Sequence, residues 1–348
     1  MSILALARPD IVSIKAYSHA SWDPAFERLH ANELPWRAET DRSLAGLNRY
    51  PEPHPHVLAQ RLATLYGVQD EQLLPGRGSD ESIDLLVRGF CRAGVDNVII
   101  CPPTFGMYAV AARIQGAEVR EVLLLSGRGF ALDTARVLAA CDANTRIVSL
   151  CSPNNPTGNA MDPVAIEQVL SALANRSLVV VDEAYIEFSG DASLTAALAR
   201  FPNLVVLRTL SKAFGLAGAR VGSLIAQPAI VALLAKVIPP YSIPQLTIET
   251  VLATLADPQL AIQRERVAQI RAERERLRAA LANCRPVQKI WPSVANFLLV
   301  DFTDADAVLA SARAAKLLIR DMRNVSPQSL RISVGSPEQN DRLIRSLA

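Results

Sequence analysis

The chain has 348 residues, half of them apolar, which is enough to bury a large core and to form two domains of unequal size. Lysine and arginine total 36 against 34 aspartates and glutamates, so the net charge of +2 gives no reason to expect a nucleic acid or an anionic membrane as partner. No apolar run is long enough to cross a bilayer, and the apolar stretch from residue 3 to 7 is too short for a signal peptide. Five dispersed cysteines fit a reducing compartment better than a disulfide framework, so we expect a cytoplasmic protein.

The first forty or so residues are irregular and rich in aromatic residues and proline, which indicates an extended arm. His54 and His56 alternate with prolines a little further on, and a proline-stiffened loop explains them better than a metal site. From about residue 58, helical spacing alternates with short β-branched runs, which predicts a doubly wound α/β fold with buried, largely parallel strands. In chain order, the four most continuous runs cover residues 98–101, 147–151, 178–181 and 204–207.

Prolines at 239, 240 and 244 mark a domain boundary. Residues 245–282 then predict a helical segment broken near Asp257-Pro258, and its alternating arginines and glutamates indicate an ion-paired surface rather than a nucleic-acid-binding helix. Short strands and helices follow, which suit a smaller α+β domain. The sequence therefore predicts an N-terminal arm that packs with the small domain (1–40), a three-layer α/β/α large domain with a mostly parallel sheet (41–240) and a small α+β C-terminal domain (241–348).

Polar residues that could carry chemistry follow the four runs directly, where ligands bind in open parallel sheets. After the fourth run come Ser211, Lys212 and, beyond a short turn, Arg220. A lysine amine is nucleophilic only when deprotonated, and desolvation by Phe214 and Leu216 together with repulsion from Arg220 would lower its pKa. The Ser211 hydroxyl and the guanidinium of Arg220 could also bind a phosphate group.

Asp182 and Tyr185 follow the third run. A carboxylate here could keep the ring nitrogen of a bound heteroaromatic group protonated, and the phenol could donate to a ring oxygen, although a helix cap explains Asp182 better when these residues are taken alone. Asn155 follows the second run in a turn rich in asparagine and proline. It could bond the same ring oxygen, and a plain turn also explains the composition.

Two earlier segments complete the set. Gly78 to Glu81 open a helix, where Ser79, Asp80 and the backbone amides could cradle a phosphate, and a capping motif is an equally good interpretation. Phe105 follows the first run and could stack on an aromatic ring or fill the core. Together these groups are what one aromatic phosphate cofactor with a basic ring nitrogen requires, which points to pyridoxal 5′-phosphate (PLP).

With these motifs the chain resembles fold-type I PLP-dependent aminotransferases and, more narrowly, the histidinol-phosphate aminotransferase family. The resemblance runs from residue 17 to residue 335. The motifs that carry it are His30-Ala31-Asn32-Glu33, Leu47-Asn48-Arg49-Tyr50-Pro51-Glu52-Pro53, Gly78-Ser79-Asp80-Glu81, Pro103-Thr104-Phe105-Gly106-Met107-Tyr108, Ser152-Pro153-Asn154-Asn155-Pro156-Thr157-Gly158 and Leu330-Arg331-Ile332-Ser333-Val334-Gly335.

The resemblance implies transamination between histidinol phosphate and 2-oxoglutarate, a step of histidine biosynthesis. It implies that Lys212 holds the cofactor as a Schiff base and then moves the proton. It also implies a homodimer with shared active sites, in which Tyr50 reaches the phosphate of the partner's cofactor. The other cofactor-binding residues would be Ser79, Asp80, Phe105, Asn155, Asp182, Tyr185, Ser211 and Arg220. The anionic end of the substrate would be bound by Arg331, assisted by Arg320, Asn32 and Tyr17.

Two positions depart from the family pattern. Phe105 stands where members often carry tyrosine, and Leu34 stands where they often carry asparagine. Three other functions are compatible with the sequence. An aromatic-amino-acid aminotransferase would share every cofactor residue, a phospho-amino-acid decarboxylase would break a different bond, and a PLP-fold sensor would bind without turnover but usually carries a DNA-binding module that nothing here predicts.

Overall fold

The computed structural model describes residues 3–23 and 25–347. Its centre is a seven-stranded sheet in the order β1-β7-β6-β5-β4-β2-β3. Strands β2 to β6 run parallel, and β7 is antiparallel to both of its neighbours. The strands are β1 (Leu73–Gly76), β2 (Asn97–Ile100), β3 (Glu118–Glu121), β4 (Thr145–Cys151), β5 (Leu178–Asp182), β6 (Leu204–Thr209) and β7 (Gly222–Ile225).

The central strands are buried on both faces, which explains why they are continuous apolar runs rather than alternating ones. The four predicted runs correspond to β2, β4, β5 and β6, so this prediction is confirmed. Strand β3 lies at the sheet edge and carries charged side chains, as edge strands commonly do.

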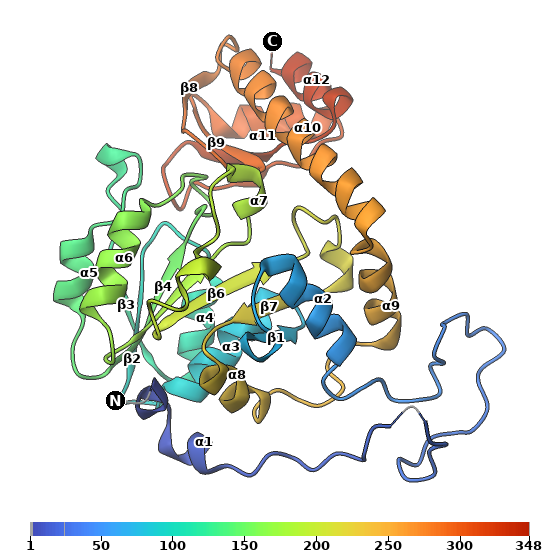
Figure 1. Cartoon of the computed structure of the whole chain (residues 1–348). Coiled ribbons are helices and arrows are strands. Elements are labelled where there is room, and N and C mark those ends of the chain that lie inside the picture. The colour runs from blue at the N-terminus through green and yellow to red at the C-terminus, as the bar shows by residue number, and fades with distance from the viewer. Residues whose placement is uncertain (1–2, 24, 348) are drawn as a thin grey trace.

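Helices cover both faces of this sheet (Figure 1). One layer contains α2 (His56–Tyr66), α5 (Thr134–Ala140), α6 (Pro163–Ala172) and α9 (Gln245–Thr254). The other contains α3 (Ser79–Phe90), α4 (Met107–Gln115) and α8 (Pro228–Ala235). The predicted three-layer α/β/α fold is therefore confirmed, and α9 belongs to the large-domain core although it follows the predicted boundary.

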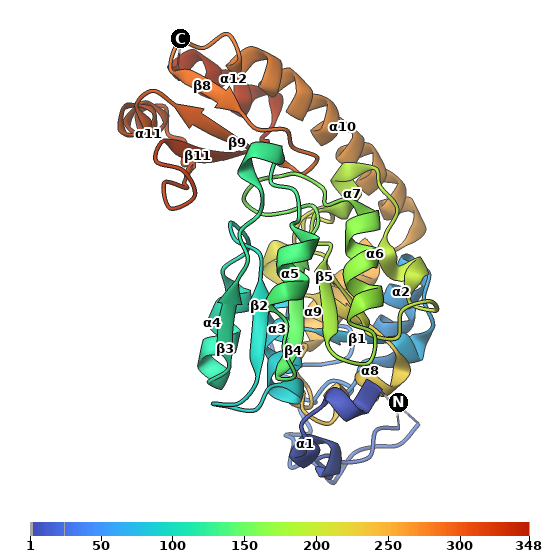
Figure 2. The ribbon, with the colours of Figure 1, turned by 90° about the vertical axis from the view of Figure 1, so that its left-hand side faces the viewer.

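The C-terminal part forms a second, smaller core around a four-stranded antiparallel sheet in the order β10-β11-β9-β8. The long helix α10 (Asp257–Leu281) runs along both domains, and the small sheet lies beyond the carboxyl ends of the large one (Figure 2). The predicted helix break is confirmed, because α9 ends at Thr254. The remaining elements are β8 (Val287–Ile290), β9 (Phe297–Phe302), α11 (Ala305–Ala314), β10 (Arg320–Asp321), β11 (Ser329–Ser333) and α12 (Pro337–Ser346).

The N-terminal segment begins with a 3-10 helix, η1 (Ile3–Leu6), and the short helix α1 (Pro9–Ser13). Leu6 and Ala7 pack into the large-domain core, and Arg8 donates to the carbonyl oxygen of Arg88 (3.2 Å). From residue 14 to 50 the described residues form neither helix nor strand, and much of this segment projects from the molecule as a loop (Figure 1). The loop returns to α9, where the amides of Leu44 and Ala45 donate to Glu249 (both 3.0 Å). The packing of residues 1–40 on the small domain and the exact domain division stay predictions.

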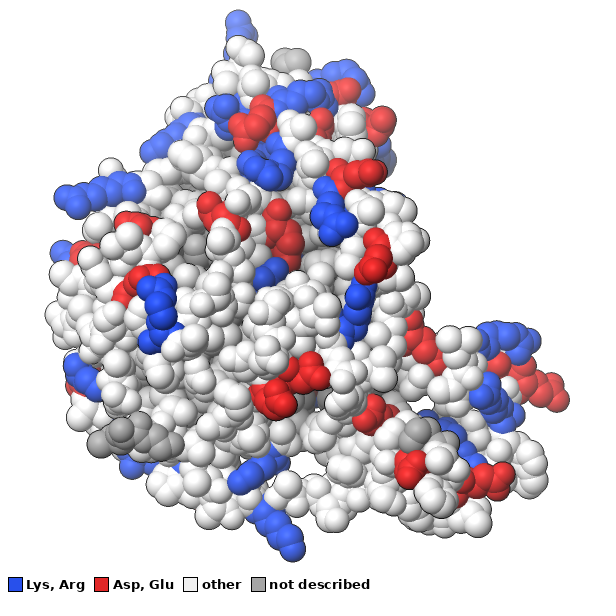
Figure 3. Space-filling view, in the orientation of Figure 1, with Lys and Arg blue, Asp and Glu red and all other residues white. Residues whose placement is uncertain are grey.

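The surface agrees with the balanced composition. Basic and acidic side chains are interspersed over the face shown in Figure 3, including the projecting arm. On α10 the predicted ion pairs are present, for example Arg276 with Glu273 (2.6 Å). Among the described residues, no helix is long and apolar enough to span a membrane.

Candidate active site

A cavity of about 220 Å³ opens at the carboxyl ends of β4, β5 and β6. It brings together ten of the residues that the sequence nominated, from both domains. Its lining residues are Ser79, Asp80, Phe105, Cys151, Asn155, Asp182, Ala184, Tyr185, Thr209, Ser211, Lys212, Arg220 and Arg331.

Asp182 is the last residue of β5 and is buried at the floor of this cavity. One carboxylate oxygen accepts from the amide of Ala184 (3.0 Å), and the other accepts from the hydroxyl of Tyr108 (2.8 Å). Burial raises the pKa of Asp182 to about 6, against the lowering effect of these two donors. The site thus holds a fixed carboxylate that can accept one further N–H donor.

Lys212 lies on the loop after β6 and lines the same cavity. Its pKa is lowered, mainly by desolvation and next by the positive charge of Arg331, whereas Arg220 contributes less. Its ammonium group lies 5.6 Å from the ring centroid of Tyr185. The pocket therefore shifts Lys212 toward the neutral, nucleophilic amine compared with a lysine in water, and Arg331 rather than the expected Arg220 is the stronger cationic neighbour.

The other end of the cavity is built to bind an anion. Ser79 is the first residue of the twelve-residue helix α3, whose free amides carry partial positive charge. The guanidinium of Arg220 lies 3.3 Å from the hydroxyl of Ser211 and 3.3 Å from the carboxylate of Asp80. Strand β7 passes directly beneath, and a Cβ atom at Gly222 would lie 2.5 Å from the backbone nitrogen of Ser79. Glycine at 222 is thus required to bring the helix start against the sheet.

Arg331 reaches the cavity from β11 of the small domain. It donates to the side-chain oxygen of Asn155 and packs against the ring of Phe297 (5.2 Å). Its Nε atom is buried and has no hydrogen-bond partner among the described residues. Arg331 is thus a cationic lining residue of the cavity with one unused N–H donor.

Four nominated residues do not line this cavity within the described chain. Arg320 is exposed and lies opposite Arg331 in the register of β10 and β11. Tyr17, Asn32 and Tyr50 belong to the projecting arm, where Tyr50 stacks on the ring of Tyr241 (4.8 Å). Their roles stay predictions.

Four residues of the site were missed by reasoning from the sequence. Cys151, Ala184 and Thr209 line the cavity, and Tyr108 binds Asp182 from α4. Only Tyr108 had a usable signal, because it lies three residues after Phe105, whose ring it contacts edge-on at 5.7 Å. Phe105 itself lines the cavity, where its side chain can stack on a bound aromatic ring.

The arrangement fits PLP. A buried carboxylate for the ring nitrogen and an anion cradle for the phosphate lie in the same cavity, with a lysine of lowered pKa beside them. The cavity also presents the side chains of Asn155 and Tyr185, which can hold a phenolic oxygen.

Comparison with known proteins agrees with this geometry. The family model "aminotransferase class I and II" matches residues 24–347. The chain belongs to this family, and it is an aminotransferase that uses PLP.

Its similarity to individual members is more specific. The chain is 46% identical to a histidinol-phosphate aminotransferase of Xylella fastidiosa (strain 9a5c), over 99% of this chain and 96% of the relative. It is 47% identical to one of Xanthomonas campestris pv. campestris, over 99% and 97%. The crystal structure of histidinol-phosphate aminotransferase from Sinorhizobium meliloti in complex with PLP superposes with a TM-score of 0.75 at 27% identity, over 87% of this chain and 84% of that one.

Proposed function

We propose that this protein is a histidinol-phosphate aminotransferase that converts L-histidinol phosphate and 2-oxoglutarate to imidazole-acetol phosphate and glutamate in histidine biosynthesis. The observation that carries the proposal is the convergence of Lys212, Asp182 and Arg331 on one cavity with an anion-binding helix start. The near-complete coverage of relatives that bear this name supports the choice of substrate.

We propose that Lys212 would hold the cofactor covalently and that its amine, when free, would move a proton at the substrate Cα. Bound PLP supplies an electron sink for the charge that develops there. Asp182 accepts a hydrogen bond from the ring nitrogen and keeps it protonated, since a buried carboxylate is stabilised by a cationic partner. The lowered pKa of Lys212 suits a residue that must act as base at neutral pH.

The remaining cavity residues orient the cofactor. We propose that Ser79, Ser211, Arg220 and the amides at the start of α3, including that of Asp80, bind the phosphate. Phe105 stacks on the ring. Asn155 and Tyr185 bind the phenolic oxygen, and the Nδ2 group of Asn155 can donate to it while its Oδ1 atom keeps accepting from Arg331.

Arg331 binds the phosphate end of the substrate in this proposal. Its planar guanidinium can bind two phosphate oxygens at once, and the contact with Asn155 shows that it already reaches the cofactor cavity. Arg320, opposite it in the strand register, adds a second positive charge. Asn32 and Tyr17 are proposed to assist from the arm.

We propose that the protein is a cytoplasmic homodimer in which Tyr50 of each chain binds the cofactor phosphate of the other. The arm supports this, because it exposes large apolar side chains such as Leu29 (95% exposed), Leu44 (83%) and Trp36 (73%). Exposed apolar surface of this kind is typical of a protein interface. All five cysteines are free thiols, as expected in a reducing compartment.

The test compares amino donors with 2-oxoglutarate as acceptor. PLP-loaded protein is given histidinol phosphate, phenylalanine, tyrosine or phosphothreonine, and glutamate formation is followed. We expect histidinol phosphate to be preferred by kcat/KM. Preference for phenylalanine or tyrosine would overturn the substrate and leave the cofactor chemistry intact, whereas carbon dioxide release from phosphothreonine would indicate a decarboxylase.

A further inference from the structure

A buried charged cluster lies behind the cofactor cavity. It consists of Arg208 on β6, Glu183 directly after β5 and Glu187 on the short helix α7 (Ile186–Ser189). The Nη1 atom of Arg208 lies 3.4 Å from a carboxylate oxygen of Glu183, and its Nη2 atom donates to Glu187 at 2.6 Å. The side chains of Arg208 and Glu183 are only 9% and 2% exposed. The two arms of one guanidinium therefore bind two separate carboxylates.

Further contacts hold Arg208 and Glu183 in place, although Nε of Arg208 and one carboxylate oxygen of Glu187 are buried without a hydrogen-bond partner among the described residues. Arg208 stacks over the ring of Tyr66 at the end of α2, 4.5 Å from the ring centroid. Both oxygens of Glu183 also accept further hydrogen bonds, from the hydroxyl of Ser193 (2.6 Å) and from the amide of Leu194 (2.7 Å). The fork of Arg208 thus lies between fixed partners and cannot move without breaking several contacts.

The position of the cluster relative to the cavity follows from strand geometry. Successive strand residues point to opposite faces, so Arg208 points away from Thr209, which lines the cavity. Glu183 follows Asp182 in the same way. The cluster therefore joins the backbone of the two segments that carry Asp182 and Lys212, from the face opposite the cofactor.

We propose that Arg208 is a positioning residue that fixes the distance between Asp182 and Lys212. Its fork ties the segment from Glu183 to Glu187, which follows Asp182 directly and contains Tyr185, to β6, and Lys212 lies four residues after Arg208. A buried ion pair adds little to stability compared with apolar side chains of the same size. We therefore assign Arg208 a role in positioning the site rather than in stabilising the fold. The inference rests on the roles of Lys212 and Asp182 proposed above.

The decisive variants are Arg208→Lys and Arg208→Met. Lysine keeps the charge but has a single charged atom, so it cannot bridge Glu183 and Glu187 as the guanidinium does. We expect both variants to lower kcat by about a hundredfold, because small misplacements of reacting groups have effects of this size. We also expect the pH midpoint of the Lys212-bound cofactor absorbance to move and the dissociation constant for PLP to rise.

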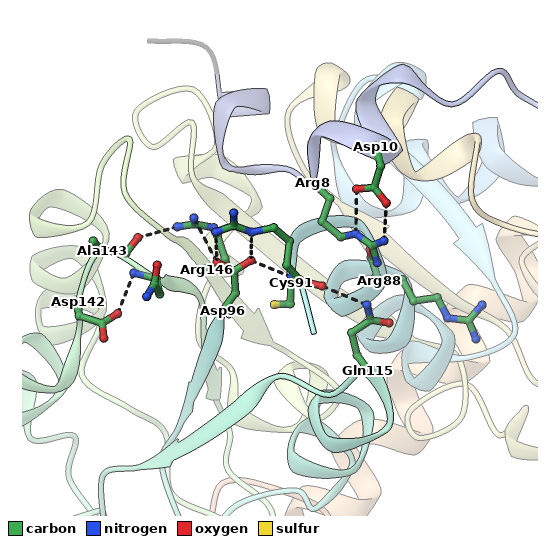
Figure 4. Close-up of polar contacts among 11 residues, drawn as sticks. Arg8, Asp10, Arg88, Cys91, Asp96, Gln115, Asp142, Ala143 and Arg146 are labelled. Atoms are coloured by element: carbon green, nitrogen blue, oxygen red, sulfur yellow. Dashed lines mark hydrogen bonds and ion pairs between the residues drawn. The ribbon is translucent and has the colours of Figure 1, made fainter. Parts of the chain in front are cut away.

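A control is available at the amino ends of the strands, at the other end of the sheet from the cavity. Asp96 is fully buried just before β2, between Arg92 (2.8 Å) and Arg146 (3.2 Å), as Figure 4 shows for Arg146. Asp96→Asn breaks ion pairs to a buried carboxylate at the amino ends of the strands, with arginines that are more exposed than Arg208. It should lower the melting temperature and leave the absorbance titration and kcat unchanged.

The outcomes separate positioning from stability. Loss of kcat and a moved titration in Arg208→Lys, with neither in Asp96→Asn, supports the proposal. A lower melting temperature with wild-type titration and kcat in the Arg208 variants overturns it, and Arg208→Lys alone decides if Arg208→Met does not fold. A wild-type protein without the Lys212-dependent absorbance would refute the Lys212 assignment itself, which is a different failure.

Discussion

Replacing Asp182 by asparagine should stabilise the cofactor-free protein at neutral pH while destroying its activity. Burial raises the pKa of Asp182 from 3.8 to about 6. Since each pKa unit corresponds to about 1.4 kcal/mol, ionising this carboxyl costs the folded state about 3 kcal/mol. Asparagine has nearly the same shape, and its amide can still pair with the amide of Ala184 and the hydroxyl of Tyr108.

The sign of the pH dependence follows from linkage. The raised pKa means that the folded protein holds this proton to higher pH than the unfolded chain does, so the wild type loses stability as pH rises between about 4 and 6. Asp182→Asn lacks this loss. The two proteins should be equally stable near pH 4, and the variant should be more stable by about 3 kcal/mol at pH 7.

Urea denaturation of cofactor-free protein from pH 4 to 8 measures this difference. Asp142→Asn is a control of opposite sign, because hydrogen bonds from Asn97 and the backbone lower the pKa of Asp142. That variant should lose about the same stability at every pH from 4 to 8, because the deficit would disappear only below the ordinary pKa of an aspartate. If the gap between Asp182→Asn and wild type is the same at pH 4 and pH 7, burial of an ionised Asp182 is not its cause.

Three further predictions concern the remaining parts of the site. Lys212→Ala should lack the visible absorbance of covalently bound PLP and show no turnover. Normal turnover of this variant would contradict the role of Lys212 as the residue that binds the cofactor. Arg331→Lys keeps the charge but loses the bidentate fork, so KM for histidinol phosphate should rise about tenfold in steady-state assays, with kcat less affected. Gly222→Ala places a Cβ atom 2.5 Å from the backbone nitrogen of Ser79 and should push the start of α3 away from the sheet. Titration of the variant with PLP should show weaker binding, and wild-type affinity would argue against the phosphate cradle.

Four of the seven strands of the large sheet were predictable because their signal is local, whereas β1, β3 and β7 were not predicted. A strand buried on both faces needs a continuous run of apolar, often β-branched side chains, and such runs mark β2, β4, β5 and β6 to within a residue or two. The site residues Asn155, Asp182 and Lys212 were predictable for a related reason. Each follows one run directly, and the carboxyl ends of parallel strands meet at one edge.

Contacts between distant segments were not predictable from these patterns. Tyr108 binds Asp182 across 74 positions of the chain, and Arg208 binds Glu183 across 25. Each depends on which strands are neighbours and in what register, which the sequence of a single run does not encode. That α9 packs into the large-domain core was not predictable either, because an apolar helix face does not specify the element against which it packs.

The sequence by itself thus determined the βα alternation, the groups available for cofactor chemistry and their place at strand ends, since these follow from residue type and local spacing. The tertiary structure alone decided what surrounds Lys212. Arg331 from the small domain, rather than the nearby Arg220, is its stronger cationic neighbour, because packing of the two domains brings residues far apart in the chain into one cavity.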